Sequence, residues 1–158
     1  MSEITREGLQ GLLEPILKMI GDKTLDADLE IELNSKYPSS SPEYKAIEAA
    51  CHAAIKAGWM CKYEADGIRY GRVIKPVEEL NGFSVDVVDM DDIRGPHHRH
   101  PQGEIDMIFP MDKNANFDGM GAGWKVYATN TAHYPTVTGG RALILYLLPD
   151  GEIEFTGK

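Results

Sequence analysis

The hydrophobic positions change their spacing at Gly58, and this change divides the chain into two regions. Before Gly58, apolar residues recur every three or four positions, which is typical of amphipathic helices. This spacing predicts a first helix over residues 3–20, which Pro15 should kink or divide. A short second helix should begin at Thr24 as its N-cap. A third helix should begin at Ser41 as its N-cap, with Pro42 in its first turn, and run to about Lys56.

After Gly58 the chain breaks into short segments that are separated by Gly, Pro, Asn and Asp, a pattern typical of antiparallel strands. The predicted strands cover residues 68–74, 82–88, 104–109, 124–128, 141–148 and 152–155. Helices followed by many short strands indicate a mainly β fold, a sandwich or a barrel, with a helical segment before it. We therefore expect a helical region at 1–58 that packs on a β domain at 59–158.

Composition and charge narrow the range of functions. The net charge of −9 argues against nucleic-acid binding, which needs a basic face. No apolar run approaches the ~20 residues that span a bilayer, and the first residues lack the apolar core of a signal peptide. Cys51 and Cys61 stand outside any tight motif, which indicates free thiols in a reducing cytoplasm, although one disulfide between them stays open.

Three of the five histidines lie close together in the middle of the chain. Side chains alternate along a strand, so His98 and His100 should project to the same side. Two imidazoles and the following carboxylate, Glu104, are suitable ligands for a divalent metal. We hypothesise that His133, on a later strand, completes a site for one Fe, Mn, Zn or Ni ion. The alternatives are a solvated turn for the cluster and a hydrogen-bonded core histidine for His133.

The same residues carry a family resemblance. His98-x-His100-x-x-x-Glu104 resembles the first metal motif of the cupin superfamily, and His133 resembles the histidine of its second motif. The resemblance implies a cupin-like antiparallel β-barrel, or double-stranded β-helix, in which all four residues bind the metal. The glycine that usually stands three residues before the second-motif histidine is Asn130 here, and asparagine tolerates the left-handed backbone of that turn.

A narrower resemblance covers most of the chain. Four segments are similar to the 4-hydroxylaminobenzoate lyase family of nitroaromatic degradation: residues 67–76, 82–86, 95–106 and 135–142. The resemblance implies that the protein converts 4-hydroxylaminobenzoate, a small aromatic substrate, to 3,4-dihydroxybenzoate (protocatechuate) and ammonia. No external redox cofactor is implied, because cleavage of the N–O bond supplies the oxidising equivalents.

The implied reaction suggests roles for further residues. A metal would act as a Lewis acid on the N-hydroxyl oxygen, and Glu104 or Asp106 would move protons. A substrate carboxylate favours a planar guanidinium. Candidates for that contact are the basic residues of the strands, Arg69, Arg72, Lys125 and Arg141. Candidates for an aromatic pocket are Tyr70, Trp124, Tyr127 and Tyr134. From these two sets we expect Arg69, Arg141 and Tyr127 to bind the substrate.

Two other functions stay open at this point. An open site of histidines and a carboxylate also suits an iron-dependent dioxygenase that acts on an aromatic ring, and only the dioxygenase would need oxygen. The barrel can also serve as a non-catalytic pocket for a small molecule. The N-terminal helices either cap the barrel or form a homodimer interface, and their pattern does not decide between the two.

Overall fold

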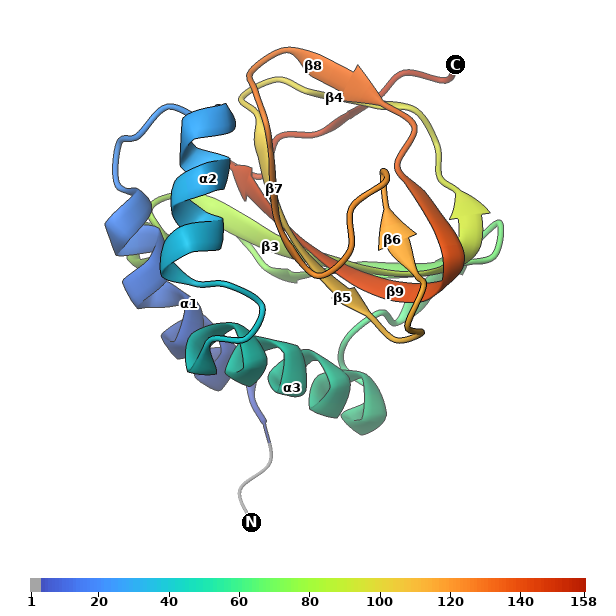
Figure 1. Cartoon of the computed structure of the whole chain (residues 1–158), viewed down its shortest axis with the longest axis horizontal. Coiled ribbons are helices and arrows are strands. Elements are labelled where there is room, and N and C mark those ends of the chain that lie inside the picture. The colour runs from blue at the N-terminus through green and yellow to red at the C-terminus, as the bar shows by residue number, and fades with distance from the viewer. Residues whose placement is uncertain (1–3) are drawn as a thin grey trace.

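The computed structural model describes residues 4–158 and places a group of helices beside a β-barrel (Figure 1). The helices of this part of the chain are α1 (Arg6–Ile20), α2 (Ala27–Lys36), α3 (Pro42–Ala57) and the short 3-10 helix η1 (Glu78–Leu80). The three predicted helices are therefore confirmed. Glu3, the predicted start of the first helix, lies outside the described residues.

The helix boundaries follow from side-chain caps. Ser41 caps α3 as predicted, and Pro42 occupies its first turn. The predicted cap of α2 at Thr24 is wrong: Asp26 is the N-cap, and its Oδ1 accepts a hydrogen bond of 2.9 Å from the backbone N–H of Leu29. A carboxylate cap also interacts favourably with the positive end of the helix dipole. Pro15 does not divide α1, which continues through it to residue 20.

The strands of the described residues are β1 (Tyr63–Ala65), β2 (Ile68–Ile74), β3 (Phe83–Arg94), β4 (His98–His100), β5 (Glu104–Pro110), β6 (Asn116–Phe117), β7 (Gly123–Tyr127), β8 (Thr131–His133), β9 (Thr136–Pro149) and β10 (Glu154–Phe155). Both β3 and β9 are longer than predicted. Their pairing shifts register between Asp91 and Ile93, and such a bulge bends a strand so that it continues around the barrel.

The strands form two antiparallel sheets. The larger sheet has the order β1-β2-β3-β9-β5-β7, with β6 paired to β9, and the smaller sheet has the order β10-β4-β8. In Figure 1 the small sheet lies opposite the large one and closes the barrel, while the helices cover the outer face of the large sheet. The predicted fold class, a cupin-like antiparallel barrel after an N-terminal helical segment, is confirmed. The division at residue 58 stays a prediction.

Alternation along β9 separates two hydrophobic cores. Leu143, Leu145 and Leu147 pack with the helices in one core, whereas Ile144 and Tyr146 belong to a second core inside the barrel. Successive side chains on a strand point to opposite faces. The inward positions of β5 are therefore the even-numbered ones, which include Glu104 of the predicted metal motif.

A buried tyrosine ties the helices to the sheet. The Tyr44 hydroxyl, on α3, accepts a hydrogen bond of 2.8 Å from the Gly123 N–H and donates one to the carbonyl of Ile108. Asn34 on α2 adds two hydrogen bonds of 2.9 Å to the backbone of Trp124, one to its N–H and one to its carbonyl. These bonds occupy edge groups of β7 and fix the helices against it.

Both cysteines are buried, and neither forms a disulfide. Burial raises the pKa of the Cys61 thiol to about 12, so the thiol is uncharged at neutral pH. None of the helices in residues 4–158 is long and apolar enough to cross a membrane.

Candidate metal centre

Three histidines and one glutamate meet inside the barrel. β4 pairs with β8 so that His98 lies directly opposite His133. The Nε2 atom of His98 lies 2.9 Å from that of His100 and 3.2 Å from that of His133. The Oε1 atom of Glu104 lies 3.5 Å from Nε2 of His98 and 3.4 Å from Nε2 of His100. One donor atom from each of the four residues lies within 4.8 Å of all the others.

The cluster is withdrawn from water. His98, His100 and Glu104 are buried and His133 is half-buried. Burial lowers the pKa of His100 to about 4, against the opposing charge of Glu104. The His100 imidazole is therefore neutral at pH 7, which is the form that binds a metal.

Hydrogen bonds at the outer nitrogens assign the protonation of two rings. His133 Nδ1 lies 2.6 Å from a carboxylate oxygen of Asp118, which can only accept, so this nitrogen donates. His100 Nδ1 lies 3.0 Å from the Thr131 hydroxyl, which donates its own hydrogen to a backbone carbonyl, so this Nδ1 donates as well. In their neutral forms, both rings therefore direct the Nε2 lone pair into the cluster.

These lone pairs and the Glu104 carboxylate fit a single bound cation. No residue of the described chain donates a hydrogen bond to either Glu104 side-chain oxygen, and an unpaired buried carboxylate is costly. Ligands about 2.1 Å from one ion lie about 3.0 Å apart at a right angle and about 3.4 Å apart in a tetrahedron. The separations of 2.9–3.5 Å match that range. The four residues of the sequence hypothesis are thus brought together in a site compatible with a metal.

Asp118 holds His133 in place. Its Oδ2 also accepts a hydrogen bond from the Tyr127 hydroxyl, and its Oδ1 accepts one of 2.9 Å from the Thr136 N–H. Burial alone would raise the pKa of Asp118, but the hydrogen bonds from His133 and Tyr127 lower it overall. A carboxylate behind a metal-binding imidazole sets its tautomer and orientation.

Asp106 is a second buried carboxyl on the inner face of β5. Neither of its side-chain oxygens has a hydrogen-bond partner within residues 4–158. Burial and the charge of Glu104 raise the pKa of Asp106 well above its usual value, while His98 and His100 lower that of Glu104 against the effect of burial. Asp106 is therefore the protonated member of the pair. It lies opposite Tyr146 in the β5–β9 register.

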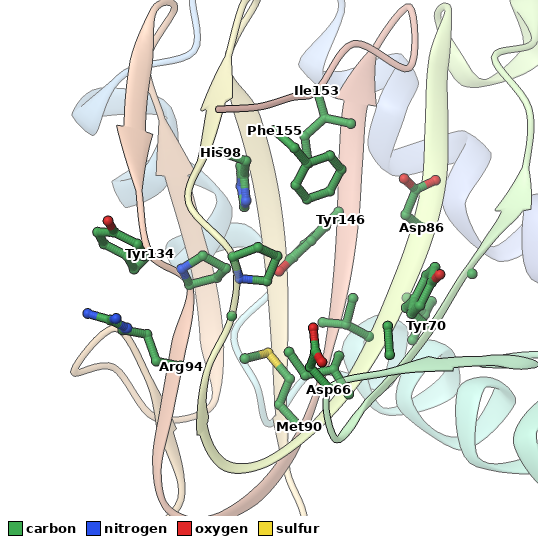
Figure 2. Close-up of a pocket in the computed structure, with 18 of the residues that line it drawn as sticks. Asp66, Tyr70, Asp86, Met90, Arg94, His98, Tyr134, Tyr146, Ile153 and Phe155 are labelled. Atoms are coloured by element: carbon green, nitrogen blue, oxygen red, sulfur yellow. The ribbon is translucent and has the colours of Figure 1, made fainter. Parts of the chain in front are cut away.

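A cavity of about 720 Å³ lies beside the cluster. Among the four clustered residues, His98 alone borders it. In Figure 2 the labelled side chains of Tyr146, Phe155 and Met90 surround the space next to His98. Cavities of this size enclose small organic ligands, so the metal centre is reached through its His98 side.

Comparison with known proteins places the chain in a family. Residues 12–155 match the family described as 4-hydroxylaminobenzoate lyase. The chain belongs to the 4-hydroxylaminobenzoate lyase family. A member from Nocardioides sp. (strain LMS-CY) is 36% identical over 150 residues, covering 89% of each chain. A member from Pseudomonas putida is 33% identical over 167 residues, covering 95% of each.

One solved structure supports the fold. A chain from crystal structures of DMSP lyases aligns with a TM-score of 0.50 at 14% identity, over 97% of this chain and 95% of that one. An RmlC-like cupin from Ralstonia eutropha JMP134 aligns with a TM-score of 0.42 at 14% identity, over 58% of this chain and 60% of that one. At these sequence identities, the likeness concerns the fold and nothing beyond it.

The three residues expected to bind substrate have other partners in the structure. Arg141 forms two bonds with Asp89, at 2.8 and 2.5 Å. Arg69 donates a hydrogen bond of 3.4 Å from Nε to the carbonyl of Cys61. Tyr127 stacks near the clustered histidines and bonds to Asp118. None of the three predicted residues lines the cavity.

Other side chains border the cavity instead. Tyr70 and Tyr134, two of the four aromatic candidates, line it, whereas Trp124 is buried in the helix-facing core. Sequence reasoning missed Asp118 and Arg94. A usable signal existed for Arg94, which stands four residues before His98, but none for Asp118, whose contact with β8 depends on a loop.

Proposed function

We propose that this protein is a metal-dependent carbon–nitrogen lyase that converts 4-hydroxylaminobenzoate and one water to 3,4-dihydroxybenzoate and ammonia. The names of the related family members support the reaction. The observation that carries the metal dependence is the convergence of three imidazoles and one carboxylate beside a cavity. In this reaction the ring loses two electrons and the nitrogen gains them, so no external oxidant or reductant is required.

Imidazole nitrogens with one carboxylate oxygen suit a borderline divalent ion, so Fe, Mn, Zn and Ni are the candidates. Such an ion would supply Lewis acidity toward the N-hydroxyl oxygen and so weaken the N–O bond. His98, His100, Glu104 and His133 would hold it. His98 is the member at the cavity wall, so we place the hydroxylamino group of the substrate against this side of the centre.

Departure of the N-hydroxyl oxygen requires a proton, and Asp106 is suited to hold it. Opposite residues on neighbouring strands have Cβ atoms about 5 Å apart, which places the carboxyl of Asp106 near Tyr146. Tyr146 in turn borders the cavity. We assign to Asp106 the storage of a proton, and to the Tyr146 hydroxyl its transfer toward the substrate. Glu104, which the sequence offered as the alternative, would be occupied as a metal ligand.

The walls of the cavity match an aromatic ring. Tyr134, Phe155 and Met90 contribute apolar surface, and aromatic and thioether groups pack well against a benzene ring. Exclusion of bulk water by these side chains would limit the reaction to a water held near the metal centre.

The test is an anaerobic assay of the purified protein with 4-hydroxylaminobenzoate, with ammonia and 3,4-dihydroxybenzoate as readouts and elemental analysis of the same sample. We expect stoichiometric metal and full activity without oxygen. Activity that requires oxygen would instead support an iron-dependent dioxygenase, and a bound metal without turnover would support a binding protein.

Variants connect the activity to the cluster. Replacing both His98 and His100 by glutamine should remove the metal and lower ammonia release at least about 100-fold. His52→Gln, on α3 away from the cluster, is the matched control. Unchanged ammonia release in the double variant would contradict the proposed metal dependence.

A further inference from the structure

The cavity beside the metal centre is charged differently at its two sides. Figure 2 shows Arg94 beside Tyr134 at the left and Asp86 at the right, with Asp66 below the centre. An anionic group is attracted to the Arg94 side, whereas the Asp86 side offers no unpaired positive charge, because Asp86 pairs with Arg72. A benzoate entering this cavity therefore has a preferred direction.

Among the described residues, the other two basic side chains that line the cavity are already paired or less suited to a carboxylate. Arg72 pairs with Asp86 through two contacts, of 2.8 and 3.2 Å, and donates a further hydrogen bond of 2.8 Å to the carbonyl of Gly151. Lys158 also lines the cavity, but an ammonium cannot form the paired, planar contacts of a guanidinium with a carboxylate.

Arg94 is free to bind a ligand. Within residues 4–158 it forms no ion pair with a carboxylate. Its Cζ atom lies 4.4 Å from the centroid of the Tyr134 ring, and His97 packs edge-on against the same ring at 4.7 Å. Stacking on an aromatic face orients a guanidinium while leaving the N–H groups at its edge available.

The short stretch of chain between Arg94 and His98 limits the gap that a substrate must bridge. Arg94 and His98 are four residues apart, so their Cα atoms lie no more than about 14 Å from each other. The backbone between them is held by a hydrogen bond of 2.6 Å from the Gly95 N–H to the Pro135 carbonyl. A single benzene ring with a substituent at each end bridges such a gap once the arginine side chain extends toward it.

We propose that Arg94 binds the substrate carboxylate and so selects substrates that carry an anionic group para to the reacting nitrogen. This inference rests on the proposed lyase function. It replaces the sequence-based expectation of Arg69 and Arg141, neither of which lines the cavity.

The test compares 4-hydroxylaminobenzoate with the neutral 4-hydroxylaminobenzamide. Arg94→Gln should lower kcat/KM for the benzoate about 10- to 100-fold, mainly through KM, because the charge-assisted hydrogen bonds to the substrate carboxylate are lost. The value for the amide should change less than about twofold, and Arg94→Lys should recover part of the loss because it keeps the charge. Arg6→Gln is the matched control, since Arg6 also stacks on an aromatic ring, 5.0 Å from the centroid of Trp59, outside the cavity.

A binding measurement separates this inference from the proposed function. Calorimetry should show that Arg94→Gln weakens the binding of 3,4-dihydroxybenzoate but leaves the binding of catechol, which lacks the carboxylate, unchanged. If the wild type released no ammonia, the proposed function would fail, and the calorimetry would still decide the role of Arg94. Suppose that the wild type is active, and that Arg94→Gln keeps both the ratio of kcat/KM for the benzoate to that for the amide and the stronger binding of 3,4-dihydroxybenzoate than of catechol. Arg94 would then be excluded as the residue that binds the carboxylate. The same conclusion would follow if Lys158→Gln, and not Arg94→Gln, lowered the ratio of kcat/KM for the benzoate to that for the amide.

Discussion

Asp118 should control metal affinity without touching the metal. Its carboxylate accepts three hydrogen bonds, from His133 Nδ1, the Tyr127 hydroxyl and the Thr136 N–H. Asp118→Asn keeps the shape but changes one oxygen to an NH₂ donor. If the amide oxygen faces His133, the NH₂ group meets the N–H of Thr136. If the amide turns over, its NH₂ group meets His133 Nδ1, which then accepts, and the proton moves to Nε2, where it blocks metal binding.

Either arrangement of the amide carries a cost. Loss of the carboxylate behind a metal-binding histidine typically reduces affinity 10- to 100-fold, which corresponds to about 1.4–2.7 kcal/mol. We expect the loss of metal affinity in Asp118→Asn to lie in this range, because the hydrogen bond of 2.6 Å between the carboxylate and His133 is replaced by a contact with an uncharged amide.

Competition titration with a chromophoric chelator measures the change. Asp112→Asn is the control, because Asp112 is exposed and bonds to the backbone of Arg141 away from the cluster. Thermal unfolding of the metal-free forms shows whether the substitution disturbs the fold. Unaltered metal affinity in a folded Asp118→Asn protein would refute the orientation argument.

Three further predictions concern stability. Tyr44→Phe leaves two buried backbone groups unpaired and should cost about 1–3 kcal/mol in urea unfolding. Gly103→Ala should destabilise by more than about 2 kcal/mol in the same assay, since Gly103 has φ +91° and its new Cβ would lie 2.7 Å from the carbonyl oxygen of Tyr127. In the metal-free protein the melting temperature should fall between pH 6.5 and about 4, because the unfolded chain takes up a proton at His100 that the folded chain, with its lowered pKa, does not.

Controls accompany each of these. Tyr63→Phe, at an exposed tyrosine, should leave stability unchanged, and an equal loss in both tyrosine variants would contradict the hydrogen-bond argument. Gly119 also has a positive φ but has open space around it. The loss of stability in Gly119→Ala therefore measures the backbone strain alone, and any additional loss in Gly103→Ala measures the steric clash of the new Cβ. His100→Gln should show a smaller loss of stability between pH 6.5 and 4, and a drop equal to that of the wild type would assign the effect to other groups.

Local patterns were sufficient for much of the architecture. The three helices follow from apolar spacing and from caps such as Ser41, which act within one turn. The predicted span of β2 agrees with the structure at both ends. Asn130 takes the expected left-handed conformation, with φ of +66°. The cap of α2 was misplaced because Thr24 and Asp26 are both suitable residues, and local preference alone does not choose between them.

For the metal motif too, one part was predictable from local sequence and another part depended on the fold. The inward direction of His98 and His100 was readable from the chain, because side chains alternate along any strand. The pairing of β4 with β8, which brings His133 opposite His98, depends on residues 35 positions apart. The motif resemblance anticipated that contact, whereas spacing along the chain did not require it.

The surroundings of the metal centre depended on the assembled barrel. Asp118 reaches His133 from a loop, and Arg94 borders the cavity at the end of β3, after the register shift between Asp91 and Ile93. Backbone geometry sets which side of a strand a residue occupies, and that information is present in every short segment of sequence. Which strands become neighbours, and which charged side chains are left without a partner, follows from packing the whole chain. The proposed direction of the substrate in its cavity therefore depends on the folded molecule.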